Sequence, residues 1–459
     1  MNEEKKLNML QSLVLLLLII GSVAVCIRLK TGGPMIGLFM SWIIIYLFCK
    51  VLKMDYDKVV SGAYDAIRVV VPTLCLLMAI GVMIGTWLQS GTIASIIVGG
   101  LKMINPTWLL PLTLVFCAVL SLVTGTSYGS VGSAGVAMMA IGNAMGINSG
   151  MVAGAVICGA MFGDKLSPLS DTTNLAPAVA GAKLNDHVRS MLWTTLPTFA
   201  ISLVLFTILG ISQTSGGYEE GNLLVYVDAL QGEFKLGIVT LIPAIVIIVL
   251  LLCKVNAIVS LGLSAVCAGA VSWFCQGATL QSIIRVAYNG YSTQIEEAIL
   301  KTILNRGGMS SMLQYVAIIC FAVGMGGMLD RLGVLENILN AITDRIHSDG
   351  SLILASLLVG YVTSLISCSQ PMSHVLTGNM MKPLFKERKI APEILSRTLE
   401  DAGTLSGPMI PWHGYCVYMA GTLGVAWFAF FPYLFLLYLT PLFSIFYGFT
   451  GISIKHIEE

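Results

Sequence analysis

The stretch GDKLSPLSDTTNLAP, residues 163–177, places two aspartates, a lysine, four Ser or Thr residues and two prolines in fifteen positions, with long apolar runs on both sides. Non-helical backbone at membrane depth is tolerated only where protein or a water-filled cavity surrounds it. The stretch therefore predicts the unwound middle of a membrane-spanning helix. We expect its hydroxyl, amide and carboxylate oxygens to face such a cavity.

The composition of the whole chain is that of a polytopic helical membrane protein. Of 459 residues, 56% are hydrophobic and 11% are charged, and the mean hydropathy is +0.87. A soluble domain usually carries about 25% charged residues. Apolar runs such as 9–27, 236–253 and 427–447 are long enough to cross roughly 30 Å of hydrocarbon as helices. We therefore predict an all-α protein that resides in a lipid bilayer, and the net charge of +1 gives no indication of a nucleic-acid partner.

Charged loops predict the topology. The stretch 212–235 holds four acidic residues and one lysine, whereas 381–397 holds five basic residues. The positive-inside rule places the first outside the cell and the second in the cytoplasm. These assignments predict about ten transmembrane helices plus two re-entrant hairpins, 106–147 and 351–383. Both termini are expected in the cytoplasm, and the expected location is a bacterial inner or plasma membrane.

Similar short motifs occur in the two halves of the chain. SLVTGTSYG from Ser121 matches SLISCSQPM from Ser364, and LSDTTNLAP from Leu169 matches LEDAGTLSGP from Leu399. Paired interruptions in two halves are the best sequence indication of a transporter's midplane site. We predict inverted repeats over 1–212 and 236–459, joined by an extracellular linker, 213–235. The predicted broken helices cover 150–183 and 395–424.

The polar breaks supply the candidate site. A carboxylate within a membrane helix is costly and is by default functional, and carboxylate, amide and hydroxyl oxygens suit a hard cation. We predict Na⁺ as the coupling ion, with no further cofactor and no bound metal. The predicted ion-binding residues are Asp171, Thr172, Thr173, Asn174, Thr126 and Ser127; those predicted to contact a substrate or a proton are Asp401, Thr404, Ser369, Gln370, Trp412 and His413. The adjacent Asp164 and Lys165 suggest either a charge pair at the mouth of the cavity or part of the site.

Four stretches resemble the NhaC-type sodium/proton antiporter family: FGDKLSPLSDTTNLAP (162–177), LNRGGMSSM (304–312), LSRTLEDAGTLSGPMIPW (395–412) and MAGTLGV (419–425). The resemblance implies membership of the wider ion-transporter superfamily, with an elevator-type transport domain and a homodimeric scaffold. It implies Na⁺/H⁺ exchange or Na⁺-linked exchange of malate and lactate. His413 occupies a position where the family pattern has Asn, which favours an organic solute over plain ion exchange.

Two function hypotheses follow within transport. The first is a secondary antiporter in which Asp171 binds Na⁺ or a proton in competition. The alternative is Na⁺-coupled transport or exchange of a small organic acid or amino acid through the same cavity. An enzyme is disfavoured because GTSYG, residues 125–129, lies between apolar helices and lacks the strand that a nucleophile elbow requires. A channel is disfavoured because no run of rings suggests a multi-ion filter.

Overall fold

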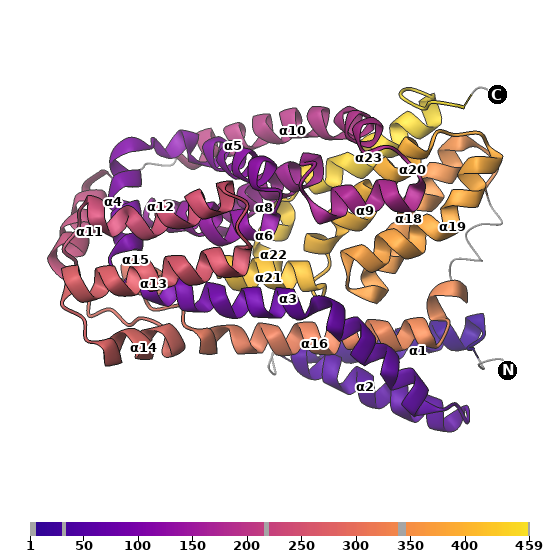
Figure 1. Ribbon diagram of the computed structural model, residues 1–459, viewed down its shortest axis with the longest axis horizontal. Helices are drawn as coiled ribbons and strands as arrows, with labels where there is room; N and C mark the ends of the chain where they lie inside the picture. The colour runs from indigo at the N-terminus through magenta and orange to yellow at the C-terminus, as the bar shows by residue number, and fades with distance from the viewer. Residues whose placement is uncertain (1–5, 30–33, 215–219, 338–345, 458–459) are drawn as a thin grey trace.

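The computed structural model describes residues 6–29, 34–214, 220–337 and 346–457, and within these ranges every regular element is a helix (Figure 1). One isolated bridge, between Ile390 and His456, is the only β-type pairing in the described residues. The prediction of an all-α protein is confirmed.

The first part of the chain, up to residue 214, contributes a long series of helices. In order, these are α1 (Met9–Arg28), α2 (Pro34–Val51), α3 (Tyr56–Gln89), α4 (Thr92–Met103), α5 (Pro106–Thr124), α6 (Ser127–Ser130), the π-helical turn η1 (Val131–Gly135), α7 (Val136–Ala144), α8 (Ser149–Leu166), α9 (Asp171–Ala180) and α10 (Leu184–Thr214).

The remaining helices follow residue 219. They are α11 (Glu220–Glu233), α12 (Ile238–Leu252), α13 (Ala257–Gln276), α14 (Leu280–Asn289), α15 (Ala298–Leu304), α16 (Met309–Arg331), α18 (Asp349–Ser367), α19 (Gln370–Glu387), α20 (Pro392–Leu399), the π-helical turn η2 (Glu400–Thr404), the 3₁₀ turn η3 (Gly407–Met409), α21 (Gly414–Leu423), α22 (Trp427–Phe430), the 3₁₀ turn η4 (Phe431–Tyr433) and α23 (Phe435–Thr450). Thus α11 occupies much of the predicted linker 213–235.

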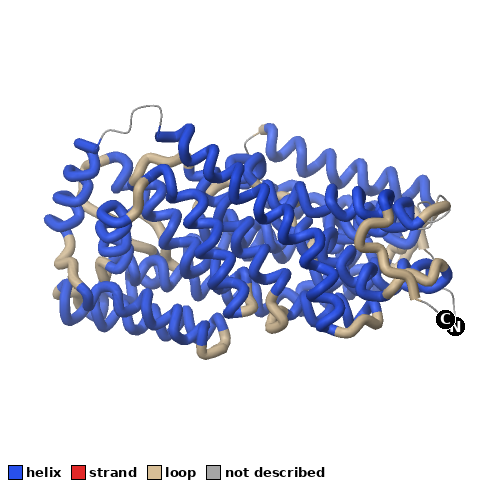
Figure 2. The backbone as a smooth tube through the Cα atoms, turned by 90° about the horizontal axis from the view of Figure 1, so that it is seen from above, coloured by secondary structure: helices blue, strands red, loops and turns tan. Residues whose placement is uncertain are grey.

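Many of these helices are long and apolar enough to cross a membrane. Seven described helices meet that condition, or up to ten when each sharply bent pair is taken as one span. The prediction of a polytopic membrane protein is therefore confirmed. In Figures 1 and 2 both ends of the chain lie at the same end of the elongated molecule. Their cytoplasmic placement and the inverted relation of the two halves stay predictions.

Small residues let the long helices approach closely. A Cβ added to Gly62 of α3 would lie 2.5 Å from the carbonyl oxygen of Gly327 of α16, and these two helices run side by side (Figure 1). Close backbone approach at glycines is a common means of helix association in membranes, where the lipid gives no hydrophobic drive between helices. The pair of α3 and α16 forms one side of the cavity described below.

The two hairpin tips share a backbone conformation. After α5, Gly125 adopts a left-handed conformation with φ +70°, and Thr126 then turns extended. After α18, Cys368 is left-handed with φ +54°, and Ser369 is extended. The sequence similarity between SLVTGTSYG and SLISCSQPM therefore corresponds to a repeated local structure.

The two interruptions downstream of these tips differ. Between α8 and α9 the chain is non-helical at residues 167–170, and the two helix axes meet at an angle of 49°. In the second half, Asp401 lies inside the π-helical turn η2, and the interruption comes later, between η3 and α21. Pro408 and Pro411, which have no N–H to donate, explain why the chain leaves the helix there. Aligning Asp401 with Asp171 as two matching break residues was therefore wrong.

Candidate functional site

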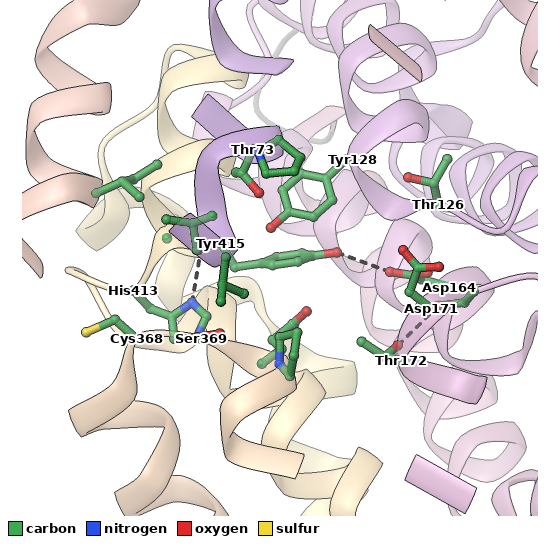
Figure 3. Close-up of a pocket in the computed structure, with 18 of the residues that line it drawn as sticks. Thr73, Thr126, Tyr128, Asp164, Asp171, Thr172, Cys368, Ser369, His413 and Tyr415 are labelled. Atoms are coloured by element: carbon green, nitrogen blue, oxygen red, sulfur yellow. Dashed lines mark hydrogen bonds between the residues drawn. The ribbon is translucent and has the colours of Figure 1, made fainter. Parts of the chain in front are cut away.

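A cavity of about 290 Å³ lies where the two hairpin tips and the two interruptions meet (Figure 3). Helices α3 and α16 close it on one side, through Val69, Thr73 and Ile319. Apart from Thr73, its polar lining comes from four separate segments: Thr126 and Tyr128; Asp164, Ser170, Asp171 and Thr172; Ser369 and Gln370; His413 and Tyr415.

Four helix N-termini converge on this cavity. The residues before the four first turns are Thr126, Ser170, Ser369 and His413, and all four line it. They precede the helical segment 127–144, α9, α19 and α21 respectively. The N-terminus of a helix carries about half a positive charge and presents unpaired N–H groups. These four N-termini therefore contribute partial positive charge to the cavity.

Asp164 is the buried carboxylate of the site. It lies in the last turn of α8 with 5% of its surface exposed, and it lines the cavity. Its Oδ2 accepts hydrogen bonds from the hydroxyl of Ser127 and, at 3.1 Å, from the hydroxyl of Tyr415. The hydroxyl oxygens of Ser127 and Tyr415 also lie in contact with each other. These contacts tie α8 to the first hairpin tip and to α21.

Asp171 is the second carboxylate. It is the first residue of α9, it lines the cavity, and its side chain is exposed. Within the described residues its carboxylate has no hydrogen-bond or ion-pair partner, in contrast to Asp164. Figure 3 shows both carboxylates on the same side of the cavity. We call this side, defined by Asp164 and Asp171, the carboxylate wall.

The structure corrects the expected role of Lys165. Its Nζ forms an ion pair with Asp401 rather than with Asp164, and both partners are fully buried. It also donates to Thr195 at 3.0 Å, and Thr194 donates to the same Asp401 oxygen at 3.2 Å. Successive side chains on a helix point in different directions, so Asp164 faces the cavity while Lys165 faces away from it. Asp401 therefore lies outside the cavity lining.

Some of the other predicted site residues line the cavity, and the rest make hydrogen bonds that hold the surrounding segments in place. Thr126, Thr172, Ser369, Gln370 and His413 line the cavity. The remaining ones make supporting contacts: Thr173 donates to the carbonyl oxygens of Asp164 and Lys165; Asn174 donates to those of Pro168 and Ser170; Thr404 contacts the His374 ring at 3.0 Å; Trp412 donates to the Leu365 carbonyl at 3.2 Å.

The side of the cavity formed by the second half presents mainly donors. His413 Nδ1 accepts the backbone N–H of Tyr415 at 3.0 Å, so in the neutral ring the proton resides on Nε2. That Nε2 and the Oγ of Ser369 are both buried and have no partner among the described residues. We call this side, defined by Ser369, Gln370 and His413, the donor wall.

The side chains at the carboxylate wall carry a net negative charge. None of the described residues that line the cavity is a lysine or an arginine, and the nearest lysine in sequence is held by Asp401. The described residues contain no group of three or more His, Cys, Asp or Glu side chains placed to hold a metal ion. Two carboxylates and several hydroxyls instead suit a weakly held monovalent cation, or a proton.

Tyr128 is not among the predicted site residues, and Tyr415 is expected only as part of an aromatic wall beside His413. The two rings pack against each other with centroids 4.3 Å apart and planes tilted by 50°, and both line the cavity. The signal was available, because Tyr415 follows His413 by two residues at the start of a helix. Its contact with Asp164 could not be foreseen, since 251 residues separate the two.

Comparison with known proteins gives a consistent family. Residues 7–173 and 159–452 match the model of the Na⁺/H⁺ antiporter family. The Na⁺/H⁺ antiporter NhaC of Alkalihalophilus pseudofirmus is 34% identical over 452 residues, which is 98% of this chain and 97% of that protein.

Two other relatives are named as antiporters of organic solutes. The malate-2H⁺/Na⁺-lactate antiporter of Bacillus subtilis is 36% identical over 416 residues, 91% of this chain and 89% of that protein. The arginine/ornithine antiporter ArcD of Halobacterium salinarum is 33% identical over 398 residues, 86% of this chain and 82% of that protein. All of these relatives are antiporters.

Proposed function

We propose, from the premise that this chain belongs to the Na⁺/H⁺ antiporter family and to its NhaC type, that it exchanges Na⁺ for H⁺ at the carboxylate wall. The observation that carries the proposal is the pair Asp164 and Asp171 in one cavity, where no lysine or arginine is among the described lining residues. A carboxylate inside a membrane protein needs a counter-charge, and here a cation or a proton must supply it.

The helix ends offset part of the negative charge of this wall. The two carboxylates face the N-termini of the helical segment 127–144 and of α9, which contribute partial positive charge. A Na⁺ or an H⁺ supplies the remaining counter-charge. Because the same carboxylates serve both ions, the two ions compete. Exchange follows if only the neutralised site crosses the membrane.

An organic solute is the second candidate, and the size of the cavity favours it. Small-molecule sites begin at roughly 300 Å³, and this cavity of about 290 Å³ exceeds what a single ion requires. The names of the malate/lactate and arginine/ornithine antiporters agree with this candidate. Under this hypothesis Na⁺ stays at the carboxylate wall and the solute occupies the rest of the cavity.

The mode of movement is also a proposal. The cavity lies between the pair of α3 and α16 and the segments that carry the hairpin tips and interruptions. An elevator-type displacement of those segments along α3 and α16 would carry the cavity across a bacterial inner or plasma membrane. We further propose a homodimer with both termini in the cytoplasm, as the family resemblance implies.

The test uses the purified full chain in liposomes with an internal pH indicator. Addition of Na⁺ should dissipate an imposed pH gradient in the wild type, whereas K⁺ should not. Asp164→Asn should abolish the response to Na⁺. The matched control is Asp65→Asn, which removes an exposed carboxylate that pairs with Arg331 outside the cavity and should leave exchange unchanged. A wild type that fails to move protons with Na⁺ refutes the proposed exchange.

A further inference from the structure

Among the described residues that line the cavity, no acidic side chain belongs to the donor wall. Of the four helix N-termini at the cavity, those of the segment 127–144 and of α9 face Asp164 and Asp171. The N-termini of α19 and α21 face Ser369, Gln370 and His413, and none of these side chains is an acid. Both N-termini contribute partial positive charge to the donor wall.

The side chains at the donor wall are arranged to donate hydrogen bonds. Ser369 precedes the 18-residue helix α19, yet its hydroxyl does not cap that helix. Ser369 lines the cavity and is 5% exposed as a whole; its Oγ is buried and has no partner among the described residues. A serine at this position normally satisfies the first-turn N–H groups of its own helix. Here no described residue satisfies the hydroxyl, and the hydroxyl does not satisfy the helix end.

His413 adds a second unpartnered donor. The ring is 1% exposed, and its Nδ1 is occupied by the backbone N–H of Tyr415. The remaining Nε2–H is buried without a partner in the described part of the chain. A buried donor left unpaired costs about 1–3 kcal/mol, so this geometry is stable chiefly when an acceptor completes it. The amide of Gln370 is held beside it by the carbonyl oxygen of Thr404 at 2.7 Å.

We propose that the donor wall is a subsite for the carboxylate of a small organic acid. An acceptor with a full negative charge and two oxygens matches the two free donors, Ser369 Oγ–H and His413 Nε2–H, together with the end of α19. The inference rests on the proposed function, because the carboxylate wall opposite is there occupied by Na⁺ or H⁺. It adds the class of solute and the atoms that hold it.

The positions of the two walls predict which chemical group the solute carries at the end opposite its carboxylate. A solute with a carboxylate at the donor wall extends toward Asp164 and Asp171. An α-amino acid would place its ammonium group there, and a hydroxy acid would place its hydroxyl beside a bound Na⁺. The shared chemistry is the carboxylate, and the size of the cavity restricts the solute to a few carbon atoms beyond it.

The test measures binding to the purified full chain in detergent with Na⁺ present. The probes are L-lactate, L-malate and L-alanine, with lactamide as the matched neutral analogue, in which an NH₂ group replaces one carboxylate oxygen and the charge is lost. A ligand that binds the folded state raises the midpoint of thermal unfolding, and calorimetry then gives its affinity. We expect at least one carboxylate to bind and lactamide not to bind. Tighter binding of alanine than of lactate would identify an ammonium at the carboxylate wall, and the reverse a hydroxyl.

Two variants test whether Ser369 and His413 form the subsite. Ser369→Ala removes the free hydroxyl, and His413→Asn removes the Nε2 donor while Asn can still cap α21. Each should weaken binding of the carboxylate by at least about tenfold. The matched control is Ser444→Ala, which deletes an equally buried and unpartnered hydroxyl in α23 away from the cavity and should bind as the wild type does.

The outcomes separate this inference from the proposed function. Na⁺/H⁺ exchange is measured on wild-type liposomes without any organic solute. Exchange with no carboxylate binding, or with lactamide bound as tightly as lactate, overturns the subsite and leaves the exchange intact. Carboxylate binding equal in Ser369→Ala, His413→Asn and wild type also overturns it. Carboxylate binding that both variants lose, without solute-free Na⁺/H⁺ exchange, supports the subsite and refutes the plain exchanger.

Discussion

The hydroxyl of Tyr415 donates a hydrogen bond of 3.1 Å to the carboxylate of Asp164, and this contact joins α21 of the second half to α8 of the first. Tyr415 follows His413 of the donor wall by two residues, whereas Asp164 belongs to the carboxylate wall. This hydrogen bond therefore connects the two walls. We expect occupancy of one wall to alter the other through it.

Tyr415→Phe tests that connection. A hydrogen bond donated to an ionised carboxylate favours the ionised form, so its loss lets H⁺ compete more effectively with Na⁺. We expect the pH needed for half-maximal Na⁺/H⁺ exchange to rise, with folding retained because the ring still packs against Tyr128. The control is Tyr418→Phe, which removes a hydroxyl bonded to the Tyr128 carbonyl at 2.6 Å and should not move the profile. Equal profiles for both variants would contradict the connection.

Asp171→Asn should weaken Na⁺ binding without destabilising the fold. The carboxylate is exposed and has no side-chain partner in the described residues, so its loss should leave the thermal midpoint unchanged. The amide contributes no charge to the cavity, and a charge-assisted contact is worth about 1.5–3 kcal/mol. The apparent KM for Na⁺ should therefore rise by about tenfold or more. An unchanged KM would show that Asp164 alone holds the ion.

The buried pair of Lys165 and Asp401 should behave as a structural unit. Removal of one partner leaves an uncompensated buried charge, which costs about 3–5 kcal/mol. Both Lys165→Met and Asp401→Leu should therefore lower the yield of folded protein and the thermal midpoint sharply. The double variant should recover most of that loss, because no unpaired charge remains. Single variants that fold as well as the wild type would contradict this account.

Much of the cavity could be predicted from the sequence. Thr126, Asp171, Ser369, Gln370 and His413 come from four segments, and the structure brings all of them to one cavity. They could be found because polar and helix-breaking residues within apolar runs are costly unless they face such a space. Their roles in transport stay predictions.

The pairing of charged side chains could not be predicted in the same way. Asp164 and Lys165 are neighbours in sequence, yet one faces the cavity and the other faces Asp401, 236 residues away. The partner depends on the rotation of α8 about its axis, which an all-round apolar helix does not reveal. Similarly, the acidic residue in LEDAGTLSGP suggested a break at Asp401, whereas Pro408 and Pro411 place the break further on.

The contact between the first hairpin tip and the interruption of α8 depends on a glycine. Gly125 has φ +70°, and a Cβ there would lie 2.6 Å from the Cβ of Leu169. Gly125→Ala should therefore displace the tip, lower the thermal midpoint and reduce exchange. Gly277→Ala is the control, because Gly277 has φ +71° but nothing within 4 Å of the added atom. It isolates the backbone strain, about 1–2 kcal/mol. Equal losses in the two variants would show that the close approach to Leu169 is unimportant.

The most direct test of the central claim, that Na⁺ and H⁺ compete for the carboxylate wall, is the apparent KM for Na⁺ measured across a pH series on wild-type liposomes. While the wall is mostly protonated, release of one proton per Na⁺ bound should lower the KM by about tenfold for each unit rise in pH. The maximal rate should change much less. Asp65→Asn should give the same slope as the wild type. A KM for Na⁺ that is independent of pH, while Na⁺ still drives proton movement, would contradict a shared site and require two separate ones.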